Sequence, residues 1–346
     1  MTRAARQGGG VMTRDDRHRD GRAFPQPRRP GGRLAGVAAL VATACIVVAA
    51  RQATPPQDPQ RTFRAVGALV TVDVSVRDGN RLVRGLTPGD FHVEDNGVAQ
   101  TVEMLDVESL PIDLTLIVDT SGSLITMVDE VRQYVAEAAS VLRADDRVRL
   151  ITFSGEVRDV FGLQPATAPL PVEVIVADGA TAIYDAVIAG LMRTRRADRR
   201  QVLVVFTDGI ETNSAMDADA LEAVAKRSDS VLHVLLVKDV MTSRLEMPNY
   251  YQDTRRYWLS RAVPDPLAFG RAAAATGGWM QEVAVRPDLP KALRLTLEDF
   301  RTSYVLRYRP VGVAQEGWHR IDVAVTGGHT VRARSGYFWG ALNPKR

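Results

Sequence analysis

The feature that most constrains the fold of this chain is a set of short apolar runs separated by segments with helical periodicity. The runs Leu114–Val118, Val202–Phe206 and Val231–Val237 each contain at most one polar residue. Strands with so little polar character are typical of a sheet that is covered on both faces. Strands and helices in alternation predict an α/β domain with a Rossmann-like, doubly wound and mostly parallel sheet.

Further elements extend this pattern across residues 112–300. Apolar spacing predicts strands at Val148–Phe153, Val157–Leu163 and Trp279–Val283, and helices at Met127–Leu142, Ala182–Met192, Asp217–Arg227, Pro266–Thr276 and Leu289–Phe300.

Both flanks of this region are predicted to be β structure. The N-terminal flank has expected strands at Val66–Val76, Arg81–Val83 and Phe91–Glu94, with a returning strand at Val102–Val107 after the turn at Asp95-Asn96-Gly97. The C-terminal flank has them at Ser303–Tyr308, His319–Val325, Thr330–Arg334 and Tyr337–Trp339. Neither set is large enough for a core of its own. We therefore expect the two flanks to form one smaller β-sandwich-like unit.

These patterns divide the chain into six parts. They are a basic disordered tail (1–33), an apolar segment (34–50), a Pro-rich linker (51–61), a β-rich segment (62–110), the α/β domain (112–300) and C-terminal β strands (301–340) that pair with the β-rich segment.

The charge of the chain is unevenly distributed. The net charge is +3, but residues 1–50 hold nine Arg and only three Asp, which leaves 35 basic and 38 acidic residues in the remainder. A nucleic-acid-binding surface normally needs a basic patch within the folded domain. This distribution argues against nucleic acid as a partner.

The apolar segment Leu34–Ala50 follows a basic stretch and has 17 residues, the lower limit for crossing a bilayer. It is interpreted as a secretory signal peptide, as an uncleaved membrane anchor, or as a buried helix. The first two interpretations both place residues 51–346 outside the cytoplasm, in the periplasm or the extracellular space. Cys45, the single cysteine, excludes an intramolecular disulfide framework and a Cys-ligated zinc site.

Oxygen-bearing side chains gather where the predicted strands end. Asp119, Ser121 and Ser123 follow one apolar strand, Asp208 follows another, and Thr181 precedes a helix. The carboxyl ends of parallel strands share one edge of a sheet. Two carboxylates and three hydroxyls there would form an all-oxygen site, which selects Mg²⁺, or else Ca²⁺ or Mn²⁺.

These motifs resemble the metal-ion-dependent adhesion site of von Willebrand factor A domains. The resemblance rests on Asp119-Thr120-Ser121-Gly122-Ser123, on Thr181 within Gly179–Ala186 and on Asp208 within Phe206–Gly209. It covers roughly residues 112–300. The flanking segments Leu86–Phe91, Tyr304–Leu306 and Arg332–Phe338 are similar to those of bacterial proteins with a related domain. One departure is Ala180, where many relatives carry glycine, and it is expected to change loop conformation more than ligation.

The resemblance implies roles for the matched residues. Asp119, Ser121 and Ser123 would bind the cation from the first loop. Thr181 and Asp208 would coordinate it directly or through water, and exchange these roles as a partner's carboxylate arrives. The family has no common catalytic chemistry, and its members mostly bind proteins.

Simpler interpretations exist for each residue. A helix N-cap would suit Asp119, Ser121 or Ser123, and equally Thr181, and a turn before Gly209 would suit Asp208. Asp185 is expected to be a surface residue or to contact a ligand residue without binding the cation itself. Capping uses one residue and leaves the other loops unexplained, so a shared cation is favoured.

The predicted function is an exported, metal-dependent module for adhesion or scaffolding that captures a carboxylate of a protein partner. Tyr250, Tyr251, Tyr257 and Trp258, in a long loop, are candidate partner contacts. One alternative is a Mg²⁺-dependent phosphatase or hydrolase at the same strand ends, and another is a structural envelope domain with an idle metal site. Catalysis by a serine would need a nearby histidine base, and the histidines lie away from the predicted strand ends.

Overall fold

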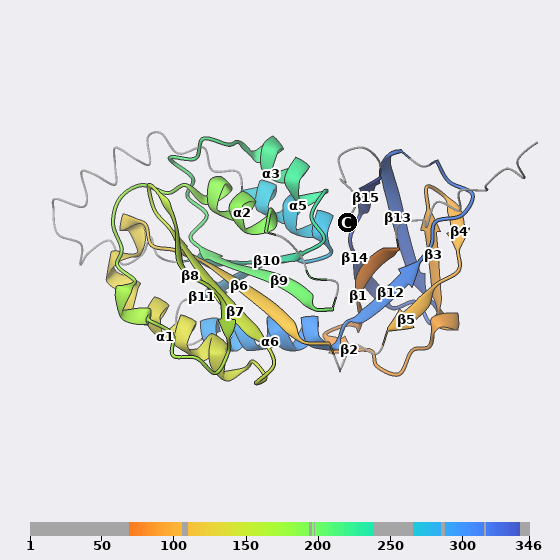
Figure 1. Cartoon of the computed structure of the whole chain (residues 1–346), viewed down its shortest axis with the longest axis horizontal. Coiled ribbons are helices and arrows are strands. Elements are labelled where there is room, and N and C mark those ends of the chain that lie inside the picture. Colours follow the sequence, from red (N-terminus) through yellow and green to blue (C-terminus); the bar gives the residue numbers. More distant parts are fainter. Residues whose placement is uncertain are drawn as a thin grey trace, which may run out of the picture. The chain divides into compact units, whose positions relative to one another are not determined.

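A six-stranded sheet forms the centre of the α/β region, in the order β11-β10-β9-β6-β7-β8 (Figure 1). The computed structural model describes residues 69–105, 110–193, 196, 198–238, 266–284, 288–314 and 316–339. The strands are β6 (Ile112–Asp119), β7 (Arg147–Phe153), β8 (Val157–Pro165), β9 (Arg200–Thr207), β10 (Val231–Lys238) and β11 (Met280–Ala284). All neighbours are parallel except β7 and β8. The predicted doubly wound, mostly parallel sheet is confirmed.

The two central strands are buried along their whole length. Every residue of β6 and of β9 is buried, because apolar cores lie on both faces of the sheet. Leu116 and Val118 contribute to one core, whereas the neighbouring Ile117 contributes to the other. The side chains of a strand alternate between faces, so the uninterrupted apolar runs supply both cores at once.

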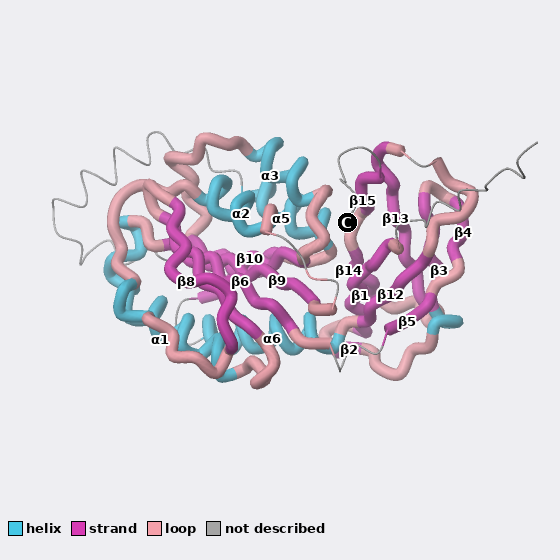
Figure 2. Tube along the Cα trace, in the orientation of Figure 1, coloured by secondary structure: helices cyan, strands magenta, loops and turns pink. Residues whose placement is uncertain are grey.

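Helices cover the two faces of this sheet (Figures 1 and 2). The core on one face includes residues of α1 (Val128–Ser140) and α6 (Asp288–Thr302). The core on the other face includes residues of α2 (Ile183–Leu191), α3 (Ala218–Ala225) and α5 (Pro266–Thr276).

Helix α2 lies very close to the central strands. A Cβ atom at Gly190 would lie 2.6 Å from Cδ1 of Ile117 and 2.9 Å from Cδ2 of Leu203. A larger residue would push the helix away from β6 and β9. Glycine therefore permits a close approach of α2 to the two central strands.

The flanks form two antiparallel sheets, shown as the strand-rich part of Figure 2. One has the order β14-β1-β12-β5 with β2 beside β1, and the other has the order β15-β13-β3-β4. The N-terminal strands are β1 (Val70–Asp78), β2 (Arg81–Leu82), β3 (Phe91–Asp95), β4 (Val98–Gln100) and β5 (Glu103–Leu105). The C-terminal strands are β12 (Tyr304–Tyr308), β13 (Gly317–Val325), β14 (Thr330–Ala333) and β15 (Gly336–Trp339).

These flanking sheets combine both ends of the described chain. Strand β1 pairs with β12 and β14, and β13 pairs with β3. A shared apolar core contains Val72 and Val74 of β1, Phe91 of β3 and Leu306 of β12. The expected β-sandwich-like unit built from both flanks is thus confirmed, and the α/β region is inserted between β5 and β12. The limits proposed for the individual domains stay predictions.

The pairing expected for one predicted strand was wrong. The returning partner of β3 is β4, Val98–Gln100, and not a strand at 102–107. Residues Glu103–Leu105 form β5, which pairs with β12 in the other sheet. The physical reason is the short turn at Asn96-Gly97: a tight turn places the return strand directly after it. The chain then crosses to the second sheet.

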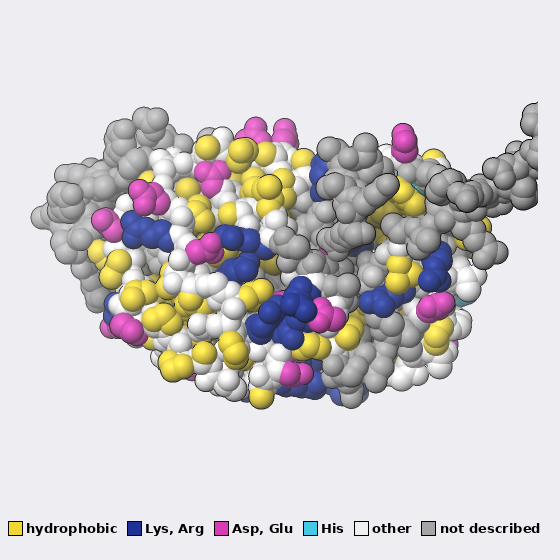
Figure 3. Space-filling view, viewed as in Figure 1, with side chains coloured by type: hydrophobic (Ala, Val, Ile, Leu, Met, Phe, Trp, Pro, Cys, Tyr) yellow, Lys and Arg dark blue, Asp and Glu magenta, His cyan; other side chains and the backbone are white. Residues whose placement is uncertain are grey.

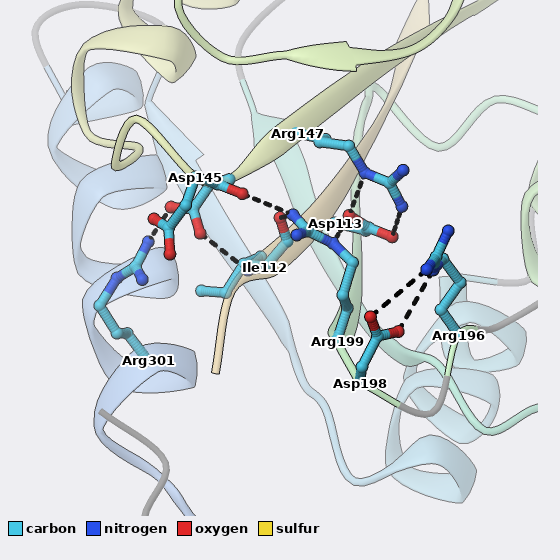
Figure 4. Close-up of polar contacts among 9 residues, drawn as sticks. Ile112, Asp113, Asp145, Arg147, Arg196, Asp198, Arg199 and Arg301 are labelled. Atoms are coloured by element: carbon cyan, nitrogen blue, oxygen red, sulfur yellow. Dashed lines mark hydrogen bonds and ion pairs between the residues drawn. The ribbon is translucent and has the colours of Figure 1, made fainter. Parts of the chain in front are cut away.

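A charged network lies at the amino-terminal edge of the central sheet (Figure 4). Asp113 of β6 accepts hydrogen bonds from Arg147 (2.9 and 2.6 Å) and from Nε of Arg199 (2.5 Å). Asp146 accepts the Ile112 amide (2.7 Å) and forms an ion pair with Arg301 of α6. These contacts hold the start of β6 and the end of α6.

On the face drawn in Figure 3, groups of Lys and Arg side chains lie next to Asp and Glu side chains. Surface ion pairs of the α/β region include Arg193 with Asp159 and Arg196 with Asp198. Among the described residues, no helix combines the length and apolar character needed to cross a membrane. The tail, the apolar segment and the linker predicted at 1–61 lie outside the described residues.

Candidate metal centre

The candidate site lies at the carboxyl edge of the sheet, between strands β6 and β9. These strands are neighbours although β7 and β8 separate them in the sequence. The register pairs Val118 with Phe206, so Asp119 at the end of β6 lies beside Thr207, which is followed by Asp208. A parallel sheet leaves a crevice where its strand order reverses in this way.

Asp119 is fully buried and is held by two neutral donors. Its Oδ1 accepts the backbone N–H of Ser121 at 2.8 Å, and its Oδ2 accepts the hydroxyl of Thr207 at 2.7 Å. The hydroxyls of Ser121 and Ser123 are 3.0 Å apart. Hydrogen bonds therefore connect Asp119, Ser121 and Ser123 within one loop.

The hydroxyls of the first two loops are not used as helix caps. Ser121 occupies the N-cap position of the short helix Gly122–Met127, but its side chain makes no capping hydrogen bond. The N-cap residue of α2 is Ala182, so Thr181 lies one position before the cap. The capping interpretation of these two residues was wrong, and their hydroxyls need another explanation.

Backbone hydrogen bonds join the second loop to the first. Gly122 N–H donates to the Gly179 carbonyl at 3.0 Å, and Asp178 N–H donates to the Thr120 carbonyl at 2.8 Å. A Cβ atom at Gly122 would lie 3.3 Å from that Gly179 oxygen, which is tighter than ordinary contact. Glycine at this position therefore lets the loop that carries Thr181 approach the loop that carries Ser121.

The third loop contacts the second. The amides of Thr212 and Asn213 donate to the Thr181 carbonyl at 3.0 and 2.9 Å, and the Thr181 amide donates to the Thr212 hydroxyl at 2.8 Å. Asp208 Oδ1 accepts the Ile210 amide at 3.0 Å, which is the local turn that the simpler interpretation expected. Thr181 is buried, and backbone contacts place it between the loops of Asp119 and Asp208.

The two carboxylates of the site repel each other. Burial, together with the charge of Asp208, raises the pKa of Asp119 to about 7, although hydrogen bonds from Ser121 and Thr207 act in the opposite direction. The cause is the cost of a charge that is removed from water beside a second negative charge. A cation at this edge would relieve both effects.

The oxygen atoms of this site suit a hard cation that is bound by both carboxylates and neutral hydroxyls. Among the described residues, no three His, Cys, Asp or Glu side chains are grouped as a metal site. A cation here would depend on two carboxylates and on the hydroxyls of Ser121, Ser123 and Thr181. Oxygen ligands of this kind fit Mg²⁺, Ca²⁺ or Mn²⁺ and do not fit soft metals.

Two residues of this region were missed from the sequence. Thr207 holds Asp119 and also accepts the Gly209 amide at 3.0 Å, and a polar residue at the end of an apolar strand was its only signal. Glu211 is buried and accepts five hydrogen bonds from the second and third loops. Asp185 accepts the amides of Ala215 and Met216, both at 2.9 Å. Asp185 thus supports the third loop, in line with the expected supporting role.

The described histidines lie away from this edge. His233 is the third residue of β10 and is buried, with neither ring nitrogen hydrogen-bonded. Burial, and then the charge of Arg332, lower its pKa to about 3. His319 is buried in the flanking unit and contacts Asp95 at 2.7 Å. In the part of the chain described, Ser121 and Ser123 therefore have no imidazole base beside them.

The candidate partner contacts Tyr250, Tyr251, Tyr257 and Trp258 lie outside the described residues, so they stay predictions.

Comparison with known proteins identifies the α/β region. Residues 113–247 match the family model of the von Willebrand factor type A domain. No curated protein matches the chain.

Several solved structures are similar at low sequence identity. BatB from Bacteroides thetaiotaomicron is 16% identical over 55% of this chain and 98% of its own, with a TM-score of 0.41. A von Willebrand factor type A protein from Catenulispora acidiphila is 13% identical over 72% and 74%, with a TM-score of 0.45. The pilus adhesin SpaC from Lactobacillus rhamnosus GG is 12% identical over 77% and 47%, with a TM-score of 0.41. These scores are below 0.5, and the similarity to the von Willebrand factor type A domain rests on the family match to residues 113–247.

Proposed function

Because residues 113–247 of this chain form a von Willebrand factor type A domain, we propose that it captures a protein partner through a divalent cation. Domains of this type are commonly involved in adhesion or protein interactions. The cation would be held by Asp119, Ser121, Ser123, Thr181 and Asp208. The partner would contribute a carboxylate.

The observation that carries the proposal is the unusual environment of Asp119. It is a fully buried carboxylate, it accepts hydrogen bonds from the neutral Ser121 amide and Thr207 hydroxyl, and Asp208 repels it. Buried carboxylates normally pair with a cation of the protein or coordinate a metal. The adjacent hydroxyls of Ser121 and Ser123 supply further oxygen ligands.

The residues of this chain prepare the site in two ways. Thr207 and the Ser121 amide each hold one oxygen of Asp119, so the orientation of its carboxylate is fixed before any ligand arrives. The hydroxyls of Ser121, Ser123 and Thr181 add no charge. When bound, Mg²⁺ (or Ca²⁺ or Mn²⁺) supplies a positive charge that two protein carboxylates and one partner carboxylate can share.

The proposed setting follows from the sequence. Export of residues 51–346, with the segment 34–50 as a signal or an anchor, would place the domain in the periplasm or outside the cell. Membrane contact would come only from that segment if it is not cleaved. We propose binding without catalysis.

Calorimetric titration of the full chain with MgCl₂ at pH 7.5 tests the cation site. Asp119→Ala and Asp208→Ala are expected to abolish the heat of binding and the stabilisation by Mg²⁺. Asp159→Ala is the matched control, because Asp159 of β8 is an exposed carboxylate that forms a surface ion pair with Arg193. Equal binding by all variants would contradict the assignment.

Crosslinking in the native envelope tests the partner. The wild-type protein should give crosslinked species that disappear in EDTA and return when Mg²⁺ is restored, and Asp119→Ala should give none of them. A crosslinked species that is the same in EDTA and in Asp119→Ala would contradict capture through the cation. Assays of the purified protein with generic phosphate and ester substrates separate this function from a hydrolase.

A further inference from the structure

The carboxylate of Glu211 connects two loops of the candidate metal centre. Glu211 lies three residues after Asp208 and is 8% exposed. Its Oε1 accepts the amides of Asn213 and Ser214, each at 2.7 Å. Its Oε2 accepts the Ser214 hydroxyl at 2.7 Å. These contacts fold the loop after β9 around the Glu211 side chain.

The same carboxylate also reaches the start of helix α2. Its Oε2 accepts the Ile183 amide at 2.9 Å and the Tyr184 amide at 3.4 Å. These amides belong to the first turn of the helix, where no carbonyl of the helix can accept them, and the N-cap residue Ala182 has no side chain that could do so. Glu211 therefore caps α2 although it belongs to another loop. The first amide that it accepts, that of Ile183, lies two residues after Thr181.

We propose that Glu211 is a positioning residue that sets the separation between Thr181 and Asp208. This inference rests on the proposed function, because it concerns the same cation site. Glu211 lies three residues after Asp208 in the same loop. Its carboxylate accepts hydrogen bonds from the two amides that follow the Thr181 segment. No other described side chain bonds both the amides at the start of α2 and those of the Asn213-Ser214 turn. Without its carboxylate, the bonds of Thr212 and Asn213 to Thr181 and those of Asp185 to Ala215 and Met216 would remain. The amides of Ile183 and Tyr184, which directly follow the Thr181 segment, would lose their acceptor.

A role in spacing can be separated from a role in stability or in charge. Mg²⁺ requires near-ideal octahedral geometry at short distances, whereas Ca²⁺ accepts longer distances and variable coordination. A change in the separation between Thr181 and Asp208 should therefore weaken Mg²⁺ binding more than Ca²⁺ binding. Loss of a nearby negative charge alone would weaken both ions to the same extent.

The experiment compares Kd values for MgCl₂ and for CaCl₂ by calorimetry on the full chain. Glu211→Ala is expected to weaken Mg²⁺ binding roughly 10- to 100-fold, as is typical for groups that support metal ligands, and Ca²⁺ binding by a clearly smaller factor. Glu211→Gln keeps one acceptor oxygen, so its Mg²⁺ affinity should lie between that of Glu211→Ala and that of the wild type. If Glu211→Ala does not fold, Glu211→Gln still gives the comparison of the two ions.

Asp217→Ala is the matched control. Asp217 caps helix α3 by accepting the Ala220 amide at 2.8 Å, so its loss removes an acidic cap of a helix that carries no proposed ligand. It should lower the melting temperature and leave both Kd values unchanged. Glu211 variants that bind both ions as the wild type does, or that lose both equally, would overturn the spacing role while the proposed function stands. A wild type that binds neither ion would overturn both.

Discussion

Strand β6 carries an aspartate near each end, and the two carboxylates are stabilised in different ways. Asp113, at the amino edge of the sheet, is 2% exposed and forms ion pairs with Arg147 and Arg199. Asp119, at the carboxyl edge, is 0% exposed and accepts hydrogen bonds from the Ser121 amide and the Thr207 hydroxyl.

This difference separates a carboxylate that is paired with arginines from one that accepts hydrogen bonds from neutral donors. A buried carboxylate that is paired with arginines has its desolvation cost offset within the protein. The neutral donors around Asp119 offset less of that cost, and Asp208 adds repulsion. At the amino edge, arginine side chains supply the positive charge that balances Asp113. At the carboxyl edge, a cation would be needed to balance Asp119 in the same way.

The largest expected effect is a pH dependence that is specific to Asp119. Its pKa is raised from 3.8 to about 7 in the folded protein. The resulting stabilisation is fully present below pH 3.8 and is lost as the pH rises through about 7. This group should therefore lower the free energy of unfolding by at most about 4 kcal/mol between pH 4 and pH 8. Urea unfolding in EDTA across this range measures the effect.

Asp119→Asn is the control for this pH dependence, because an amide does not titrate. The wild-type and variant curves in EDTA should diverge as the pH rises, with the variant more stable above pH 7. Parallel curves would show that ionisation of Asp119 does not lower the free energy of unfolding.

The opposite result is expected at the other end of the strand. Asp113→Asn leaves two arginines without their carboxylate and should lower the free energy of unfolding by about 3 kcal/mol. Their partial exposure keeps the cost at the lower end of the range for buried pairs. Chemical unfolding at pH 7.5 in EDTA compares Asp113→Asn directly with Asp119→Asn. If both variants lose the same stability, the contrast between the two edges is wrong.

Magnesium should sharpen the contrast. At a concentration 100 times Kd, a ligand that binds only the folded state stabilises it by about 2.7 kcal/mol. We expect this gain in the wild type and in Asp113→Asn, and none in Asp119→Asn. Thermal unfolding with and without MgCl₂ measures it. A gain that Asp119→Asn retains would place the cation elsewhere.

The smallest expected effect comes from Thr207→Val. This nearly isosteric change removes the donor to Asp119 Oδ2 and the acceptor of the Gly209 amide. It should cost about 1 kcal/mol and move the pH dependence of Mg²⁺ binding upward, because the ionised form of Asp119 loses a hydrogen bond. Calorimetry at several pH values tests the shift. Thr115→Val, at a buried position of the same strand β6 away from the site, is the matched control.

Much of the fold could be predicted because its signals are local. The apolar runs at 114–118 and 202–206 became the buried central strands, and the order of oxygen-bearing residues at their ends pointed to the carboxyl edge. The partner expected for the strand at 102–107 was wrong, because the choice between two sheets for β5 depends on β12, about 200 residues away. The same limit applies to Thr207 and Glu211, because their hydrogen bonds to Asp119 and Ile183 join residues that are far apart in the sequence.

The sequence by itself determined the alternation of strands and helices and which residues could ligate a cation, because periodicity and side-chain chemistry are properties of neighbouring residues. Only the tertiary structure decided that β6 lies beside β9, that Asp113 meets arginines while Asp119 meets neutral donors, and that Glu211 joins two loops. Burial and electrostatic environment depend on the groups that surround a side chain in space. Two aspartates of one strand can therefore differ in charge balance although the residue type is the same.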